Sequence, residues 1–158
     1  MNIYKNFLTK TEFKTLKSKI MDPHFPWYFN DGVNNLPDKY FQFNFLFLDE
    51  KGINCAPQFM HLIQPILSKL KYKKLTAVKA NLLTQTPKTI EHGMHADKPT
   101  GTTSIFYVNK CNGYTKFKNG KKIKSEENKL IEFKSHLEHT GSSCTDEKRR
   151  VVINFNYQ

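Results

Sequence analysis

The chain has 158 residues, of which 38% are hydrophobic and 13% aromatic. This composition excludes an intrinsically disordered protein, and the length suffices for one buried core but not for two domains of ordinary size, so we expect a single domain over residues 1–158. Lysine and arginine outnumber aspartate and glutamate by 25 to 14, and the resulting net charge of +11 would attract polyanions or acidic small molecules without indicating which.

Residues 10–20 form the first predicted element. The preceding "TKTE" has the Thr-to-Glu spacing of a capping box, and apolar residues follow at helical intervals at Phe13, Leu16 and Ile20. This pattern predicts a helix. Residues 21–39 then contain three prolines and a DG pair, which predict an ordered but irregular segment whose aromatic side chains cover apolar surface.

A strand and a second helix are predicted next. Residues 40–50, "YFQFNFLFLDE", alternate in part and are rich in aromatics, which favours a strand. Residues 57–70 place their apolar side chains on one helical stripe, although Pro65 should kink this helix or displace its start. We expect residues 1–74 to supply helical support and the first strands.

From residue 75 onward the pattern changes to short β-rich runs separated by turns that contain Gly, Asn or Pro. The runs are "LTAVKANLL" (75–83), "TIEHGMHAD" (89–97), "TTSIFYVN" (102–109), "GYTKF" (113–117), "KKIKS" (121–125), "KLIEFK" (129–134) and "RRVVINFNY" (149–157). Helices followed by many short antiparallel strands predict a mainly β, α+β protein: a barrel or double-sheet jelly roll with the helices packed on one outer face.

The cysteines indicate the redox setting. Cys55, Cys111 and Cys144 are odd in number and lack CxxC spacing, which argues against a disulfide framework or a thiolate zinc site. The N-terminus lacks the apolar core of a signal peptide, and no stretch approaches the ~20 apolar residues that span a bilayer. We therefore expect a soluble, cytoplasmic protein that makes no membrane contact.

The stretch "EHGMHADKP", residues 91–99, concentrates groups that bind metals. In a strand, residues two apart point to the same face, so His95 and Asp97 would project together and could share one metal ion. The third ligand must come from elsewhere, and His136 and His139 in "KSHLEHTGSS" are the downstream candidates. Two imidazoles and one carboxylate form the facial triad associated with non-haem Fe(II), which leaves positions open for substrates.

Two polar neighbours of this pair are treated separately. An HxD pattern alone is weak evidence, because a lone histidine is more often a surface or core residue than a ligand. By the same alternation, His92 faces the other way and should be exposed. Glu91 faces the His95 side, where it could orient a ligand without touching the metal.

The last run, "KRRVVINFNY", can be divided into two faces. An arginine entering a strand beside a metal cavity offers a planar donor fork for a substrate carboxylate. Counting by two gives a mostly polar face, suited to a cavity, and an apolar face, suited to packing against helices. The polar face holds Arg150, Val152, Asn154 and Asn156, and the apolar face holds Val151, Ile153 and Phe155.

Four features follow one another along the C-terminal half of the sequence. They are an HxD pair, a strand carrying a tyrosine, a histidine at a turn and an arginine that opens the last core strand. This order resembles that of the 2-oxoglutarate and Fe(II)-dependent dioxygenases, and most of all their prolyl-4-hydroxylase-like branch, over residues 75–157. The resemblance implies a double-stranded β-helix core, Fe(II), 2-oxoglutarate and O2, and hydroxylation of a C–H bond with release of succinate and CO2. His95, Asp97 and His139 would ligate the iron, His139 being preferred to His136 because "HTG" leads into the arginine strand.

The resemblance also implies a cosubstrate site. Arg150 would pair with the distal carboxylate of 2-oxoglutarate, and Tyr107 would hydrogen-bond the same group. Thr103 shares the strand face of Tyr107 and should line the pocket. Asn81 and Asn154 are weaker candidates for contacting the cosubstrate, because either can equally be an ordinary strand asparagine.

Other interpretations stay open at the level of sequence. The primary substrate could be a protein, a peptide such as a prolyl peptide, or a nucleic acid, and the oligomeric state is not indicated. A cupin-like metal-binding barrel with hydrolase or isomerase chemistry would use a similar fold and would not need Arg150. A basic protein that binds nucleic acid or another polyanion without catalysis is supported only by the net charge of +11.

Overall fold

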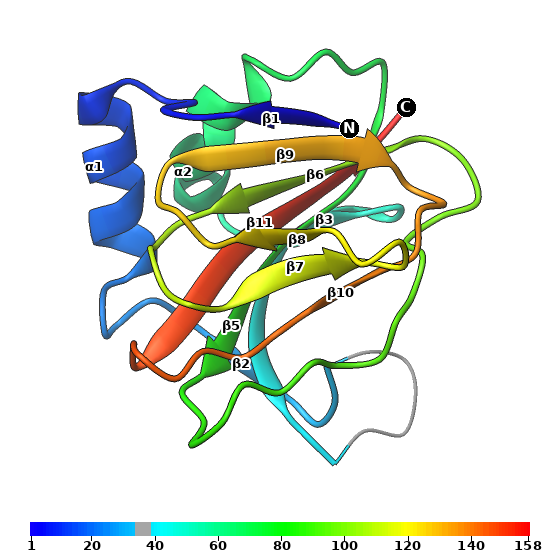
Figure 1. Ribbon diagram of the computed structural model, residues 1–158. Helices are drawn as coiled ribbons and strands as arrows, with labels where there is room; N and C mark the ends of the chain where they lie inside the picture. The colour runs from blue at the N-terminus through cyan, green and yellow to red at the C-terminus, as the bar shows by residue number, and fades with distance from the viewer. Residues whose placement is uncertain (34–38) are drawn as a thin grey trace.

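Two antiparallel β-sheets face each other in the computed structural model, which describes residues 1–33 and 39–158 (Figure 1). The larger sheet has the order β1 (Asn2–Tyr4), β9 (Lys129–Lys134), β6 (Thr102–Tyr107), β11 (Arg149–Tyr157), β5 (Leu75–Thr84), β3 (Gln42–Asp49), β2 (Tyr28–Asn30), with β4 (Gly52–Ile53) beside β3. The smaller sheet has the order β10 (His139–Gly141), β7 (Tyr114–Phe117), β8 (Lys122–Lys124). From β6 to β11 the chain passes back and forth between the sheets, which is the arrangement of a double-stranded β-helix.

The two predicted helices are present. Helix α1 (Lys10–Ile20) begins at the predicted capping box, in which Glu12 N–H donates to Thr9 Oγ1 at 3.3 Å and Thr9 N–H donates to the Glu12 carboxylate at 2.8 Å. Helix α2 (Pro57–Leu67) ends earlier than predicted and carries Pro65 in its last turn, where the missing N–H removes only one intrahelical bond. Both helices lie outside the larger sheet (Figure 1).

The main core lies between these helices and the larger sheet. Strand β11 turns its predicted apolar face toward the helices, and its residues there are fully buried. This burial removes large apolar side chains from water, each worth about 1.5–3 kcal/mol. The side chains that meet in this layer include Val151, Ile153 and Phe155 of β11, Leu16 and Ile20 of α1, and Ile63 and Ile66 of α2.

A second apolar cluster joins the two sheets. Ile105 and Val152 of the larger sheet pack with Phe117 and Ile123 of the smaller sheet. The remaining space between the sheets is a cavity of about 370 Å³. Ile105 and Val152 also line this cavity, so the apolar cluster forms part of its wall.

The first strand is tied to a distant part of the chain. Asn2–Tyr4 pair with Leu130–Glu132 of β9, so β1 forms one edge of the larger sheet. Next to it, the Asn128 side chain accepts from Leu8 N–H and donates to Leu8 C=O, both at 2.8 Å. The N-terminal segment is thus part of the sheet on which the C-terminal half is built.

The largest departure from the sequence prediction concerns residues 89–97. They form two isolated bridges, Glu91 to Ser142 and His95 to His139, in place of a continuous strand. Residues 21–39, predicted to be irregular, include strand β2, which pairs with β3; residues 34–38 of that prediction lie outside the described residues. Within the described part of the chain, no helix is long and apolar enough to cross a membrane.

Candidate metal centre and adjoining cavity

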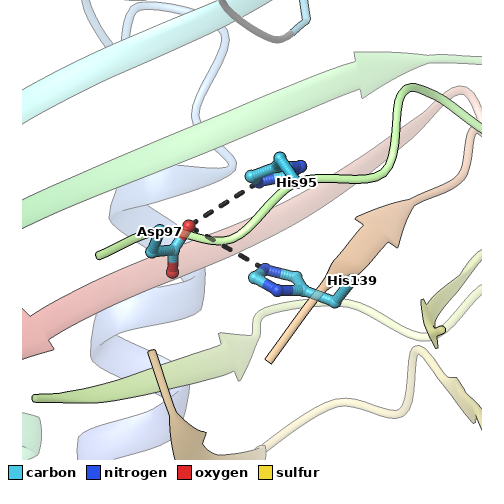
Figure 2. Close-up of side chains that lie close together, drawn as sticks. All are labelled: His95, Asp97 and His139. Carbon is cyan, nitrogen blue, oxygen red and sulfur yellow. Dashed lines mark ion pairs between the residues drawn. The ribbon is translucent and has the colours of Figure 1, made fainter. Parts of the chain in front are cut away.

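Three of the predicted site residues converge at one end of the cavity. His95 and Asp97 come from the loop between β5 and β6, and His139 opens β10. The Nε2 atoms of His95 and His139 lie 3.6 and 3.9 Å from Asp97 Oδ1, and one ligand atom from each residue lies within 4.8 Å of the others (Figure 2). The alternative candidate, His136, is exposed and does not belong to this group.

Backbone hydrogen bonds hold the three residues in place although the first two are not in a regular strand. His95 N–H donates to His139 C=O at 3.0 Å, and His139 N–H donates to His95 C=O at 2.8 Å. Asp97 N–H donates to Ser135 C=O at 3.0 Å. A single antiparallel bridge therefore replaces the strand pairing that the sequence predicted, and it still brings the side chains together.

A hydrogen bond from Nδ1 to a backbone carbonyl orients each imidazole. His139 Nδ1 lies 2.9 Å from Leu137 C=O, and His95 Nδ1 lies 3.2 Å from Gly93 C=O. A carbonyl oxygen only accepts, so Nδ1 is the donor in both rings, and Nε2 is the ring nitrogen that lies toward Asp97. Histidines that ligate metals are commonly held in this way.

The Asp97 carboxylate is oriented by two donors. Its Oδ2 accepts from Thr103 Oγ1 at 2.7 Å and from Asn156 Nδ2 at 3.0 Å, while Oδ1 is the atom nearest both imidazoles. Thr103 was predicted to line the pocket, but it is not among the residues that line the cavity; its hydroxyl donates to Asp97 instead. Three acceptor atoms thus face one another, an arrangement that a cation between them would stabilise.

The protonation of His139 also suits metal binding. Burial lowers the pKa of His139, while Asp97 and the Leu137 carbonyl act in the opposite direction. The ring is almost fully buried, with 2% of its residue surface exposed. It is therefore neutral near pH 7, the form in which imidazole binds a metal ion.

Arg150 lies in the same cavity and lacks a charged partner. The residue is 3% exposed, and its guanidinium donates to Ser125 Oγ at 2.7 Å and to Thr115 Oγ1 at 3.2 Å. Within the described residues no carboxylate lies within ion-pair distance of it. Burial lowers the pKa of Arg150, which shows the cost of keeping this charge in the interior. An anion bound beside the guanidinium would offset that cost.

Of the other predicted cosubstrate residues, Asn81 and Asn154 line the cavity and Tyr107 does not. Tyr107 is fully buried and does not line the cavity; its hydroxyl donates to Thr115 Oγ1 at 2.9 Å, and burial raises its pKa to about 12. Asn81 and Asn154 do line the cavity. Their Oδ1 atoms are buried and form no hydrogen bond with any described residue. Such an amide could form a hydrogen bond with a ligand in the cavity, through either its oxygen or its nitrogen.

Two neighbours of the triad differ from expectation. His92 was predicted to be exposed but is 9% exposed, with its ring 5.7 Å from that of Tyr40, because the alternation of a strand does not apply to this loop. Glu91 accepts from Tyr114 Oη at 2.6 Å and Lys116 Nζ at 2.7 Å. It therefore joins the loop to the smaller sheet and does not orient His95.

Some residues of the site were missed by the sequence analysis. Thr115 and Ser125 hold Arg150 from positions 35 and 25 residues away, so no local pattern indicated them. Asn156 was placed on the cavity face, but its bond to Asp97 was not foreseen. Lys79 also lines the cavity, and its position on the same face of β5 as Asn81 was the only signal for it.

The protein is thus a jelly roll whose cavity holds two imidazoles, one carboxylate and a guanidinium without an ion-pair partner among the described residues, a set that could bind a metal ion and an anion. Solved structures share this fold. A prolyl hydroxylase from Trichoplax adhaerens, in complex with a hypoxia inducible factor oxygen degradation domain peptide fragment, has a TM-score of 0.66 at 16% identity and covers 99% of this chain and 82% of its own. An oxidoreductase of the 2OG-Fe(II) oxygenase family from Burkholderia pseudomallei has a TM-score of 0.65 at 11% identity, and the match covers 94% of this chain and 78% of that protein. A Pseudomonas putida prolyl-4-hydroxylase has a TM-score of 0.65 at 13% identity, and the match covers 99% of this chain and 91% of that protein.

Comparison of the sequence with family models and with curated proteins finds no match. At identities of 11–16%, the structural similarity establishes the fold. The protein has the double-stranded β-helix fold of prolyl hydroxylases and 2OG-Fe(II) oxygenases. The fold implied by the sequence resemblance is therefore confirmed.

Proposed function

We propose that the protein is a 2-oxoglutarate and Fe(II)-dependent oxygenase that hydroxylates a C–H bond of a second substrate. The observation that carries this proposal is the pairing, in one cavity, of a three-residue metal group with a buried arginine that lacks a counter-ion. Residues 1–158 would act as one dioxygenase domain, because α1 and α2 share a core with β5 and β11.

The triad fits Fe(II). Two neutral imidazoles and a carboxylate are the donors of the facial triad, and they leave positions open for other ligands. His95, Asp97 and His139 each have one donor atom facing the others and a second polar atom already hydrogen-bonded elsewhere. They would therefore bind the ion without a large rearrangement.

The rest of the cavity fits 2-oxoglutarate. The guanidinium of Arg150 would pair with the distal carboxylate, and Thr115 would support that pair through its bonds to Arg150 and Tyr107. Asn81 and Asn154 line the same cavity, and their Oδ1 atoms form no hydrogen bond with any described residue. The volume of about 370 Å³ lies in the range of small-molecule sites.

When bound, Fe(II) and 2-oxoglutarate would supply the oxidation, in which O2 is consumed, succinate and CO2 are released and a C–H bond becomes C–OH. The protein's own part is positioning. Thr103 and Asn156 hold Asp97 in one orientation, and Arg150 would fix one end of the cosubstrate.

A protein or peptide is the substrate class that we propose. One structural neighbour is a prolyl hydroxylase in complex with a peptide fragment. A cupin-like enzyme would not need Arg150, and such barrels usually place more histidines around the metal than the two found in this group. Binding of a polyanion without catalysis would give no role to the converging donors. Nucleic acid remains a substrate to be tested.

The test is succinate release from 2-oxoglutarate by the purified protein, with and without Fe(II), since uncoupled turnover does not require the second substrate. Arg150→Met should lose a buried charge pair worth about 3 kcal/mol or more, which raises the KM for 2-oxoglutarate over a hundredfold. Arg149→Met is the matched control, because Arg149 donates to Met21 C=O on the other face of β11. Turnover that is independent of Fe(II), or equal in the two variants, would refute the proposal.

A further inference from the structure

Lys79 places a second positive charge in the cavity, on the face of β5 that also carries Ala77 and Asn81. In the larger sheet Lys79 lies opposite Asn154 of β11 and Leu46 of β3. Both neighbours are uncharged and also line the cavity. The lysine is therefore part of the cavity wall.

The ammonium group of Lys79 has no fixed partner. It forms no hydrogen bond or ion pair with any residue that the structure describes. Burial lowers the pKa of Lys79, and Asp97 is the one charge that opposes this effect. The carboxylate of Asp97 is already held by Thr103 and faces the two imidazoles. The cost of placing Lys79 here is thus only partly offset by the protein itself.

The position of Lys79 separates it from the arginine pocket. In the register of the sheet Arg150 lies opposite Leu83, whereas Asn156, which holds Asp97, lies opposite Ala77. Lys79 is two residues from Ala77 and four from Leu83, roughly 13 Å from the latter along the strand. It is also partly exposed, whereas Arg150 is 3% exposed. Along the strand, Lys79 therefore lies nearer to the end of the cavity that holds Asp97 than to the Arg150 end, and it is more exposed to solvent than Arg150.

The charges in the cavity do not balance without a further anion. This count rests on the proposed function. The charged residues that line the cavity are Lys79, Asp97 and Arg150. Fe(II) contributes two positive charges and the two basic residues one each, whereas Asp97 contributes one negative charge and 2-oxoglutarate two. One positive charge is left, and Arg150 already faces the distal carboxylate.

We propose that Lys79 binds a carboxylate of the second substrate, so that the protein selects an acidic peptide or protein segment with an Asp or Glu side chain close to the carbon that is oxidised. A single ammonium next to neutral groups suits one carboxylate. A nucleic-acid strand is instead held by a series of basic groups along its backbone. Lys98, which directly follows Asp97, is already paired with Glu50 at 2.8 Å.

The experiment uses the Fe(II)-loaded full chain and pools of random peptides with one fixed position. In one pool that position is Asp or Glu, and in the matched pool it is Asn or Gln. Succinate release and a 16 Da mass increase of the peptide are measured. We expect the acidic pool to stimulate turnover at least tenfold more than the amide pool.

Variants assign this preference to Lys79. Lys79→Met should abolish it, and Lys79→Glu should transfer it to a pool fixed as Lys or Arg. Lys71→Met is the control, because Lys71 is an exposed lysine between α2 and β5. This variant should keep the preference. Loss of the preference only in the Lys79 variants would support the inference.

The possible failures are distinguishable. Absence of Fe(II)-dependent succinate release without peptide would refute the proposed function itself. Release without peptide, but equal stimulation or none by the two pools, would overturn only the role of Lys79. The role is also overturned if Lys79→Met keeps the preference and raises the KM for 2-oxoglutarate tenfold, or if an oligonucleotide, in place of the acidic pool, stimulates the wild type.

Discussion

The bond from Thr103 to Asp97 gives the sharpest test of how the metal group is built. Thr103→Val keeps the shape of the side chain and removes only the hydroxyl, which donates to Asp97 Oδ2 at 2.7 Å. A hydrogen bond to a charged group contributes about 1.5–3 kcal/mol, which corresponds to a loss in metal affinity of roughly 10- to 150-fold. Loss of a group that orients a metal ligand typically costs 10- to 100-fold, so the two magnitudes agree.

The assay is an anaerobic Fe(II) titration of the wild type and Thr103→Val, with thermal unfolding of the metal-free proteins as a control for folding. Asn156→Leu removes the second donor to Asp97 Oδ2, at 3.0 Å, and should weaken binding in the same way. Because Asn156 also donates to Thr103 at 2.8 Å, the double variant should lose less than the sum of the two. The reasoning is wrong if Thr103→Val binds Fe(II) within twofold of the wild type while Asp97→Ala loses binding.

Three further predictions concern other parts of the site. His139→Ala should lose Fe(II) binding in the same titration while His136→Ala retains it, and the reverse result would exchange their roles. Gly113→Ala should raise the KM for 2-oxoglutarate, because a Cβ there would lie 2.6 Å from Arg150 Cδ; an unchanged KM would contradict this close packing. Hydrogen bonds from Lys116 and Tyr114 lower the pKa of Glu91 from 4.5 to about 2. Its stabilising effect should therefore be complete above pH 4.5 and disappear as the pH falls to 2, so Glu91→Gln should flatten acid unfolding over this range, measured by circular dichroism.

The parts of the fold that could be predicted depend on local patterns. The alternation along β11 correctly separated the face toward the cavity from the face toward the helices, because side-chain direction in a strand follows from the backbone alone. The capping box correctly located α1. The alternation failed for His92, because residues 89–97 contact β10 at single points and do not form a strand.

The parts that could not be predicted depend on distant contacts. The bond from Arg150 to Ser125 joins residues 25 positions apart, and neither residue has a pattern that indicates the other. The resemblance nevertheless selected His139 over His136, and the structure brings His139 to His95 and Asp97. The order of functional residues thus carried information about their assembly that local periodicity did not.

The pairing of β1 with β9 has a consequence for biosynthesis. Asn2 and Glu132 are 130 positions apart and joined by a 3.1 Å hydrogen bond. During synthesis β1 therefore stays without its partner until β9 (Lys129–Lys134) has been made. Closing such long loops is slow, so maturation of this protein should take milliseconds to seconds after synthesis and should expose it to aggregation or chaperone capture in the interval.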